Sequence, residues 1–208
     1  MKTTICLLSA TLLTSVASAF TVSTSNVEGS ASSSEVLPVT DESTSLIPTG
    51  SGIVAAGFFS TLTDSQINAT NIGLDFQIHG SASFAASSFG NPDGVFNLSG
   101  LGGTISDGSP FIGETVYIVI GNGPDLSSSS QFAVWNSGNM FAKTEDIPTT
   151  SVGVTPSNQS QLVFGSIGGS ATTGGTEFDN SLVLSSIPEP SVTILGLLGM
   201  LGLLRRRR

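Results

Sequence analysis

The chain has 208 residues, of which 6 are Lys or Arg and 15 are Asp or Glu. Five of the cationic side chains lie at the two ends, at Lys2 and at residues 205–208, so residues 20–186 carry 14 acidic side chains against one lysine, a net charge of −13. A body this acidic repels phosphate backbones and anionic lipids, which excludes nucleic-acid binding. It is compatible with calcium, with basic partners and with neutral polysaccharide.

The first 19 residues have the pattern of a secretory signal peptide. Lys2 supplies a positive charge, a mostly apolar run follows, and small side chains stand at Ala17 and Ala19, where signal peptidase acts. We expect a mature chain that begins at Phe20. Because the single cysteine, Cys6, lies in this segment, we expect the mature chain to have no disulfide and no cysteine ligand or nucleophile.

The end of the sequence, residues 187–208, has a pattern of its own. It consists of Ile187-Pro188-Glu189-Pro190, an uncharged apolar stretch at residues 191–204, and then Arg205, Arg206, Arg207 and Arg208. Pro190 fits the first turn of a helix, and Glu189 places a negative charge at the positive end of the helix dipole. Such a helix is short for a bilayer, but terminal arginines stay on the cytoplasmic side and snorkel to the headgroups. The residues therefore predict a short C-terminal transmembrane helix.

This tail resembles the PEP-CTERM sorting signal of Gram-negative bacteria. Pro188, Glu189 and Pro190 match the recognition triplet, residues 191–204 match the membrane segment, and residues 205–208 match the basic end. The resemblance implies that an exosortase, a membrane-embedded cysteine transpeptidase, recognises the triplet, removes the tail and passes the protein to the cell surface or its exopolysaccharide matrix. An ordinary tail anchor without processing shares the same physics and is the alternative.

Between the two ends we expect two parts. Residues 20–49 are rich in Ser and Thr with sparse apolar residues, and they predict an extended or partly ordered arm with at most a first edge strand. Residues 50–186 consist of short apolar segments separated by Gly-, Asn- and Pro-rich turns, and they predict an antiparallel β-sandwich with a jelly-roll or lectin-like outline. The predicted strands are residues 53–59, 72–79, 81–85, 95–98, 115–120, 131–135, 152–155, 161–164 and 181–184. The predicted turns are residues 91–94, 122–125, 136–139, 168–169 and 174–175.

Two of these strands have a pattern that predicts their environment. Residues 115–120 include a run that is apolar on both faces, and we expect this strand to be central. Residues 72–79 alternate, which predicts one buried face and one solvated face. The apolar face would carry Ile72, Leu74, Phe76 and Ile78, and the polar face Asp75, Gln77 and His79. Only residues 63–68 indicate a helix, of one or two turns.

No catalytic constellation stands out in the sequence. His79 is the only histidine, and no G-x-S-x-G motif accompanies it, so we interpret it as a surface side chain rather than a catalytic base or metal ligand. The acidic residues lie mostly in turns, and no pair of them is marked as the two carboxylates of a glycoside hydrolase. Trp135 could serve as a sugar-stacking platform or could equally be buried.

Calcium is the one metal that the loops could accommodate. The loop residues with suitable oxygen atoms are Asn122, Asp125, Asp93, Asp107 and Asp179. None belongs to an EF-hand pattern, and turn formation explains each of them alone, so we predict no cofactor and keep a structural calcium ion as the alternative.

Together these features predict a non-enzymatic exported protein. We expect it to be held at the inner membrane for a time and then placed at the cell surface or in the extracellular matrix. Its expected partners are signal peptidase, an exosortase and the membrane, with exopolysaccharide as a candidate ligand. The alternatives are a carbohydrate-binding module and, less favoured, a surface glycoside hydrolase.

Overall fold

The computed structural model describes residues 19–29, 32, 34–85 and 92–186, which form a mainly β body. All but two of the strand pairings described are antiparallel. The predicted signal peptide up to residue 18 and the predicted tail at residues 187–208 lie outside the described residues. Within the described ranges, no helix has the length and apolar character needed to cross a bilayer.

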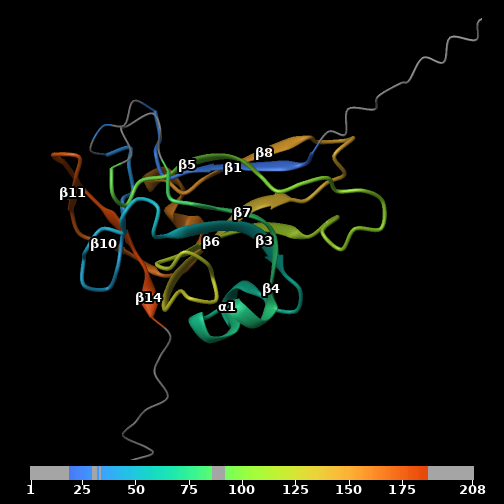
Figure 1. The fold of residues 1–208 in the computed structure, drawn as a ribbon, viewed down its shortest axis with the longest axis horizontal. Coiled ribbons are helices and arrows are strands. Elements are labelled where there is room, and N and C mark those ends of the chain that lie inside the picture. Colours follow the sequence, from blue (N-terminus) through green and yellow to red (C-terminus); the bar gives the residue numbers. More distant parts are fainter. Residues whose placement is uncertain (1–18, 30–31, 33, 86–91, 187–208) are drawn as a thin grey trace, which may run out of the picture.

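A central sheet forms the middle layer of the body (Figure 1). Its strands follow the order β14 (Ser185–Ser186), β7 (Gln131–Met140), β6 (Thr115–Gly121), β3 (Ile53–Phe59) and β4 (Phe76–Ser83), and β9 (Leu162–Phe164) also pairs with β7. β3 has the bounds that the sequence predicted, and β6 extends its predicted strand by one residue. The prediction that β6 is central is confirmed, because it lies between β3 and β7 and is buried on both faces.

A second sheet lies over one face of the central sheet. Its order is β5 (Asn97–Leu101), β1 (Thr21–Ser25) and β8 (Thr149–Gly153), with β1 antiparallel to β5 and parallel to β8. A third, smaller sheet contains β10 (Ser166–Gly168), β13 (Ser181–Val183) and β2 (Val39–Thr40). β11 (Ala171–Thr173) and β12 (Thr176–Phe178) form a hairpin whose predicted two-glycine turn has positive φ at Gly174 and Gly175.

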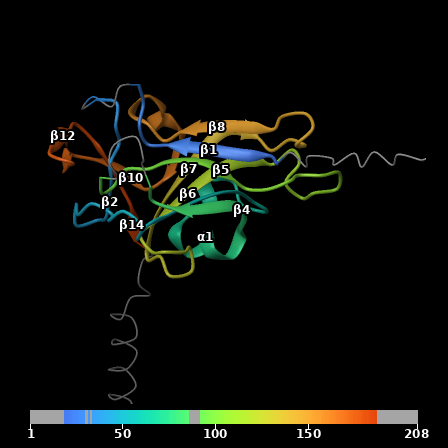
Figure 2. The same ribbon diagram turned by 45° about the horizontal axis from the view of Figure 1, so that its top comes forward.

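Alternate residues of the central strands fill two cores, one on each face. On β6, Ile118 packs into the first core, towards the second sheet, whereas Val119 packs into the second core with α1 (Ala69–Asp75). Figures 1 and 2 agree that α1 and the β5-β1-β8 sheet lie on opposite sides of the central sheet. The result is three layers, in which the central sheet is covered on both faces.

The strand predicted at residues 72–79 is wrong in its first half, where the structure has α1 followed by β4. Asn68 and Asn71 form a capping box that starts the helix, with the Asn68 N–H donating to Asn71 Oδ1 at 2.9 Å. Leu74 and Ile78, expected on a buried face, are 83% and 49% exposed. The local capping interaction therefore outweighs an alternation that spans only a few residues.

The described residues between 20 and 49, expected to form an arm, are packed into the body instead. β1 is the middle strand of the second sheet, and Phe20, Leu37 and Ile47 are buried in the first core. Although apolar residues are sparse in this segment, many of them are buried in a hydrophobic core. The hydrogen-bond partners of β1 come from strands far away in the sequence, which composition alone does not reveal.

Candidate functional site

His79 is held in an aromatic cluster and does not project from a solvated face. β4 has a bulge at this position, and the imidazole packs against the rings of Phe20, Phe111 and Phe141 at centroid separations of 5.7, 5.1 and 5.1 Å. His79 Nε2 lies 2.9 Å from the Phe20 carbonyl oxygen, which can only accept, so Nε2 carries the proton. The predicted solvated position of His79 is wrong, and the side chain links β4 to the start of β1.

Trp135 is fully buried in the first core, so it cannot serve as an exposed sugar-stacking platform. Its indole N–H donates to Gln161 Oε1 at 3.1 Å. Gln161 is the last residue of η3 (Pro156–Gln161) and directly precedes β9. The buried tryptophan therefore fixes the orientation of a polar side chain at the edge of the central sheet.

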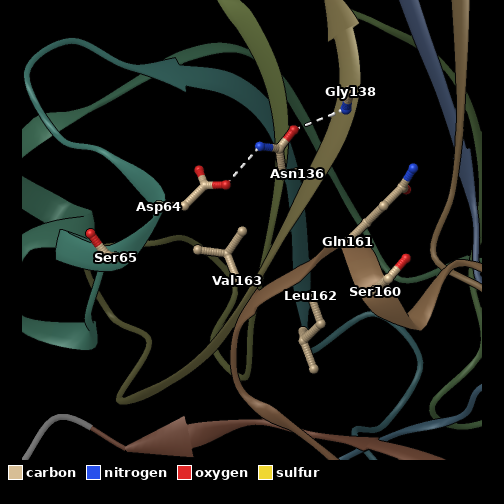
Figure 3. A pocket seen from close by; sticks show the side chains of 8 residues that line it. All are labelled: Asp64, Ser65, Asn136, Gly138, Ser160, Gln161, Leu162 and Val163. Carbon is tan, nitrogen blue, oxygen red and sulfur yellow. Dashed lines mark hydrogen bonds between the residues drawn. The ribbon is translucent and has the colours of Figure 1, made fainter.

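That edge contains an open pocket of about 440 Å³, shown in Figure 3. η1 (Asp64–Gln66), β7 and the junction between η3 and β9 bound it. The register of β7 shifts beside the pocket against both β6 and β9. The lining residues are Asp64, Ser65, Asn136, Gly138, Ser160, Gln161, Leu162 and Val163.

The turn predicted at residues 136–139 is wrong, because this segment is a bulge inside β7. Gly138 has a φ of 69°, a left-handed conformation that glycine adopts without steric cost. Its N–H donates to Asn136 Oδ1 at 2.9 Å. The bulge thus orients the Asn136 amide so that its Nδ2 donates to Asp64 on the same side of the pocket (Figure 3).

Two strand residues hold the Asp64 carboxylate in place. The Tyr117 hydroxyl donates to Asp64 Oδ1 at 2.5 Å, and Asn136 Nδ2 donates to Asp64 Oδ2 at 2.9 Å. Burial of the Tyr117 phenol raises its pKa far above the usual value, and the hydrogen bond to Asp64 and the negative charge of Asp64 raise it further. A carboxylate has about four acceptor positions, so each oxygen of Asp64 retains capacity for one more donor.

The remaining lining residues differ in character from Asp64. In the view of Figure 3, Ser160 and Gln161 lie on the side away from Asp64 and Asn136, with Leu162 and Val163 between them. Leu162 and Val163 are half-buried and supply an apolar surface. The pocket therefore combines a fixed acceptor, amide and hydroxyl donors, and a short apolar wall.

The loop residues considered for calcium remain dispersed. Asp93 accepts a hydrogen bond from the backbone N–H of Thr49, and Asp107 forms an ion pair with Lys143. Asp125 accepts hydrogen bonds from its own loop, which lower its pKa. In the part of the chain that the structure describes, no three His, Cys, Asp or Glu side chains gather as a metal-binding group.

Of the residues predicted to direct processing, only Ala19 lies within the described ranges, directly before the buried Phe20. Ala17, residues 188–190 and residues 205–208 lie outside them. Their roles in signal peptidase cleavage and exosortase sorting stay predictions.

The sequence did not identify Asp64, Asn136 and Gln161 as one site. The hydrogen bond between Asp64 and Asn136 joins residues 72 positions apart. The usable signal was the polar Asn-Ser-Gly-Asn segment directly after the buried part of β7, since polar residues at the end of a core strand often reach a site. Comparison of the chain with protein-family models, with curated proteins and with solved structures found no match.

Proposed function

We propose that this chain is an exported, non-enzymatic protein of the cell surface or exopolysaccharide matrix, sorted through Pro188, Glu189 and Pro190. The observation that carries the proposal is the position of the folded body between the two predicted processing sites. Phe20, which follows the predicted signal-peptide cleavage site, is fully buried, and β14 ends at Ser186, just before the predicted tail. All of the described core would remain in a chain processed at both sites.

The attachment of the last strand adds support. The Ser186 N–H donates to Glu42 Oε1 at 2.6 Å, and β14 pairs with β7. The hydrogen bond from Ser186 lowers the pKa of Glu42, so the carboxylate is ionised at neutral pH and the interaction is present there. Cleavage at the triplet, two residues further along, would leave this attachment intact.

The pocket supports binding better than hydrolysis. A glycoside hydrolase uses two carboxyl groups, roughly 5 to 10 Å apart, one of them as acid or base. Asp64 is the one carboxylate among the described lining residues, and both of its oxygens already accept hydrogen bonds. A carboxylate fixed in this way suits recognition of a ligand.

The proposal extends to the fold, which is a β-sandwich of jelly-roll or lectin-like outline. Its support is the second sheet, which packs on the central sheet and encloses the first core, together with the mainly antiparallel pairing. The two parallel pairings, β1 with β8 and β13 with β2, are features that such an outline must accommodate.

The experiment is to locate the full chain in a Gram-negative host that has an exosortase and in an isogenic host without it. In the first host we expect the wild-type chain in the surface and medium fractions. We expect Glu189→Ala, and the wild type in the second host, to remain with the inner membrane. Glu177→Ala is the matched control, because Glu177 is an exposed residue of β12.

Equal surface delivery of Glu189→Ala and wild type would contradict sorting through the triplet. Retention of the wild-type chain in the cytoplasm of the first host would contradict export altogether.

A further inference from the structure

The pocket around Asp64 contains polar groups that the fold orients but does not saturate. Asp64 is held by Tyr117 and Asn136, and its carboxylate oxygens keep acceptor capacity towards the open space. Because both holding residues belong to the central sheet, the carboxylate is positioned before any ligand arrives. Preorganised groups lose little conformational entropy on binding.

Gln161 supplies the complementary donor. Its Oε1 accepts from the buried Trp135 indole N–H, and because that N–H can only donate, the hydrogen bond assigns the oxygen and the nitrogen of the Gln161 amide. Its Nε2 has two hydrogens, and no hydrogen bond from Nε2 to a described residue is found. Within the described ranges the site therefore offers a fixed acceptor at Asp64 and an unused amide donor at Gln161.

Charge and shape restrict the ligand. Asp64 and the net charge of −13 on residues 20–186 disfavour an anion. One carboxylate, with no further His, Cys, Asp or Glu in a described cluster, is a poor ligand set for a divalent cation. A volume of about 440 Å³ falls within the roughly 300 to 1,000 Å³ of small-molecule sites.

A neutral sugar has the matching chemistry. Hydroxyl groups on opposite sides of a saccharide unit donate to the carboxylate and accept from the amide, which lie on different sides of the pocket in Figure 3, and its C–H face packs against an apolar surface. Val163, which lies beside Asp64 in Figure 3, contributes to that surface, whereas Leu162 packs against the first core. The geometry points to a binding site for a neutral saccharide unit at Asp64 and Gln161. This inference rests on the proposed surface or matrix location, which would bring the pocket into contact with polysaccharide.

The test measures calorimetric binding of neutral gluco-, manno- and galacto-oligosaccharides to the full chain in a detergent without a sugar headgroup. Oligogalacturonate is the anionic comparison. We expect wild type to bind at least one neutral oligosaccharide in preference to oligogalacturonate. Gln161→Glu should weaken binding about tenfold or more, since it keeps an acceptor for Trp135 but replaces the donor.

Two further variants separate the site from effects of charge and folding. Gln159→Glu adds the same charge two residues away, at a position that does not line the pocket, and should bind as wild type does. Asp64→Asn should also lose about tenfold in affinity or more, because one acceptor oxygen becomes a donor. Thermal unfolding of each variant confirms that the loss occurs in folded protein.

The saccharide site is overturned if wild type binds no neutral oligosaccharide, if it prefers oligogalacturonate, or if Gln161→Glu and Asp64→Asn both bind normally. Each of these results leaves the export proposal standing when the chain is found at the cell surface. Conversely, a chain that binds a neutral oligosaccharide through Gln161 but remains cytoplasmic supports the site and overturns the proposed location.

Discussion

Tyr117 and Asn136 occupy directly opposed positions on β6 and β7, and both donate hydrogen bonds to Asp64. Opposed residues on neighbouring strands project from the same face of a sheet. The pairing of Tyr117 with Asn136 therefore brings two donors together at Asp64, and Tyr117 also packs in the second core.

The single tyrosine of the chain reports on this arrangement. Burial, the hydrogen bond to Asp64 and the charge of Asp64 raise the pKa of Tyr117, so we expect no phenolate absorbance in the folded protein at pH 10, close to the ordinary value of about 10. In Asp64→Asn the pKa should fall towards the ordinary value, with burial still keeping it raised. The measurement is an ultraviolet titration of phenolate absorbance.

The sign of the linked stability change follows from the raised pKa. The stabilisation from neutral Tyr117 is fully present below the unfolded-state pKa of about 10 and is lost as the pH rises towards the folded-state value. Urea denaturation at increasing alkaline pH should therefore show a decline that is smaller in Asp64→Asn. An ordinary titration midpoint in folded wild type would contradict the Tyr117 to Asp64 hydrogen bond.

Asn26 is the buried polar residue on which we expect the body to depend most. Its Nδ2 donates to the carbonyls of Leu37 and Gly94 at 2.9 and 2.8 Å, and its Oδ1 accepts from the Phe96 N–H at 2.7 Å. Asn26→Ala leaves the Leu37 carbonyl and the Phe96 N–H without this partner, while the Gly94 carbonyl keeps only its hydrogen bond from the Val39 N–H. We expect the free energy of unfolding to fall by about 3 kcal/mol or more, measured by urea denaturation.

The matched control for this change is Asn139→Ala. Asn139 is exposed, and its side chain makes one long hydrogen bond, 3.4 Å to the Ser151 carbonyl. Its loss should change the free energy of unfolding by no more than about 0.5 kcal/mol. If Asn26→Ala were equally mild, the packing of residues 20–49 into the body would be contradicted.

Gly102 marks a close approach between β4 and the residues that follow β5. Its φ is 112°, and a Cβ there would overlap the imidazole of His79, while a Cβ at Gly80 would overlap the backbone of Gly102. Gly102→Ala should therefore destabilise the protein by about 2 kcal/mol or more and displace His79 from its aromatic cluster. Gly103→Ala is the control, because no atom lies within 4 Å of a Cβ built there. Thermal unfolding of the two variants tests the difference, and equal melting temperatures would contradict the close approach.

Asp75 connects the end of α1 to the segment after β3. Its carboxylate accepts from the Ser60 hydroxyl at 2.7 Å and from the Thr61 N–H at 3.0 Å. Burial alone would raise the pKa of Asp75, but these hydrogen bonds outweigh it and the pKa is lowered. At pH 7, Asp75→Asn should cost about 1 kcal/mol of stability.

The pH dependence gives this prediction its sign. A lowered pKa stabilises the fold above the unfolded-state value of about 3.9, and the contribution disappears as the pH falls through the lower folded-state value. The difference between wild type and Asp75→Asn in urea denaturation should therefore shrink below about pH 3.9. Asp179→Asn, which removes the same charge at an exposed position with no side-chain hydrogen bond to a described residue, is the control for the change in net charge. A constant difference at all pH values would contradict the assignment.

The sequence revealed the centre of the fold because local pattern and burial agree there. β3 and β6 are continuous apolar runs, and such runs are buried on both faces wherever they lie in a sheet. The periphery depends on partners that are distant in the sequence. The pairing of β1 with both β5 and β8 is the clearest case, since its own residues are mostly Ser and Thr.

The sequence did not predict the pocket for a related reason. The segment containing Asp64 was predicted as a short helix and the segment containing Asn136 as a turn. Asp and Asn are common in such surface segments, so neither residue indicated a binding site. Their meeting depends on shifts in strand register beside β7, which no local pattern specifies. Gln161 becomes notable only once the burial of Trp135 is known.

The most direct test of the proposed export and sorting is the intact mass of the native protein recovered from the surface and medium fractions of its host. We predict a chain that begins at Phe20 and ends close to Pro188, Glu189 and Pro190. A chain in those fractions that retains Arg208 would contradict processing at the triplet and leave the tail as an ordinary anchor.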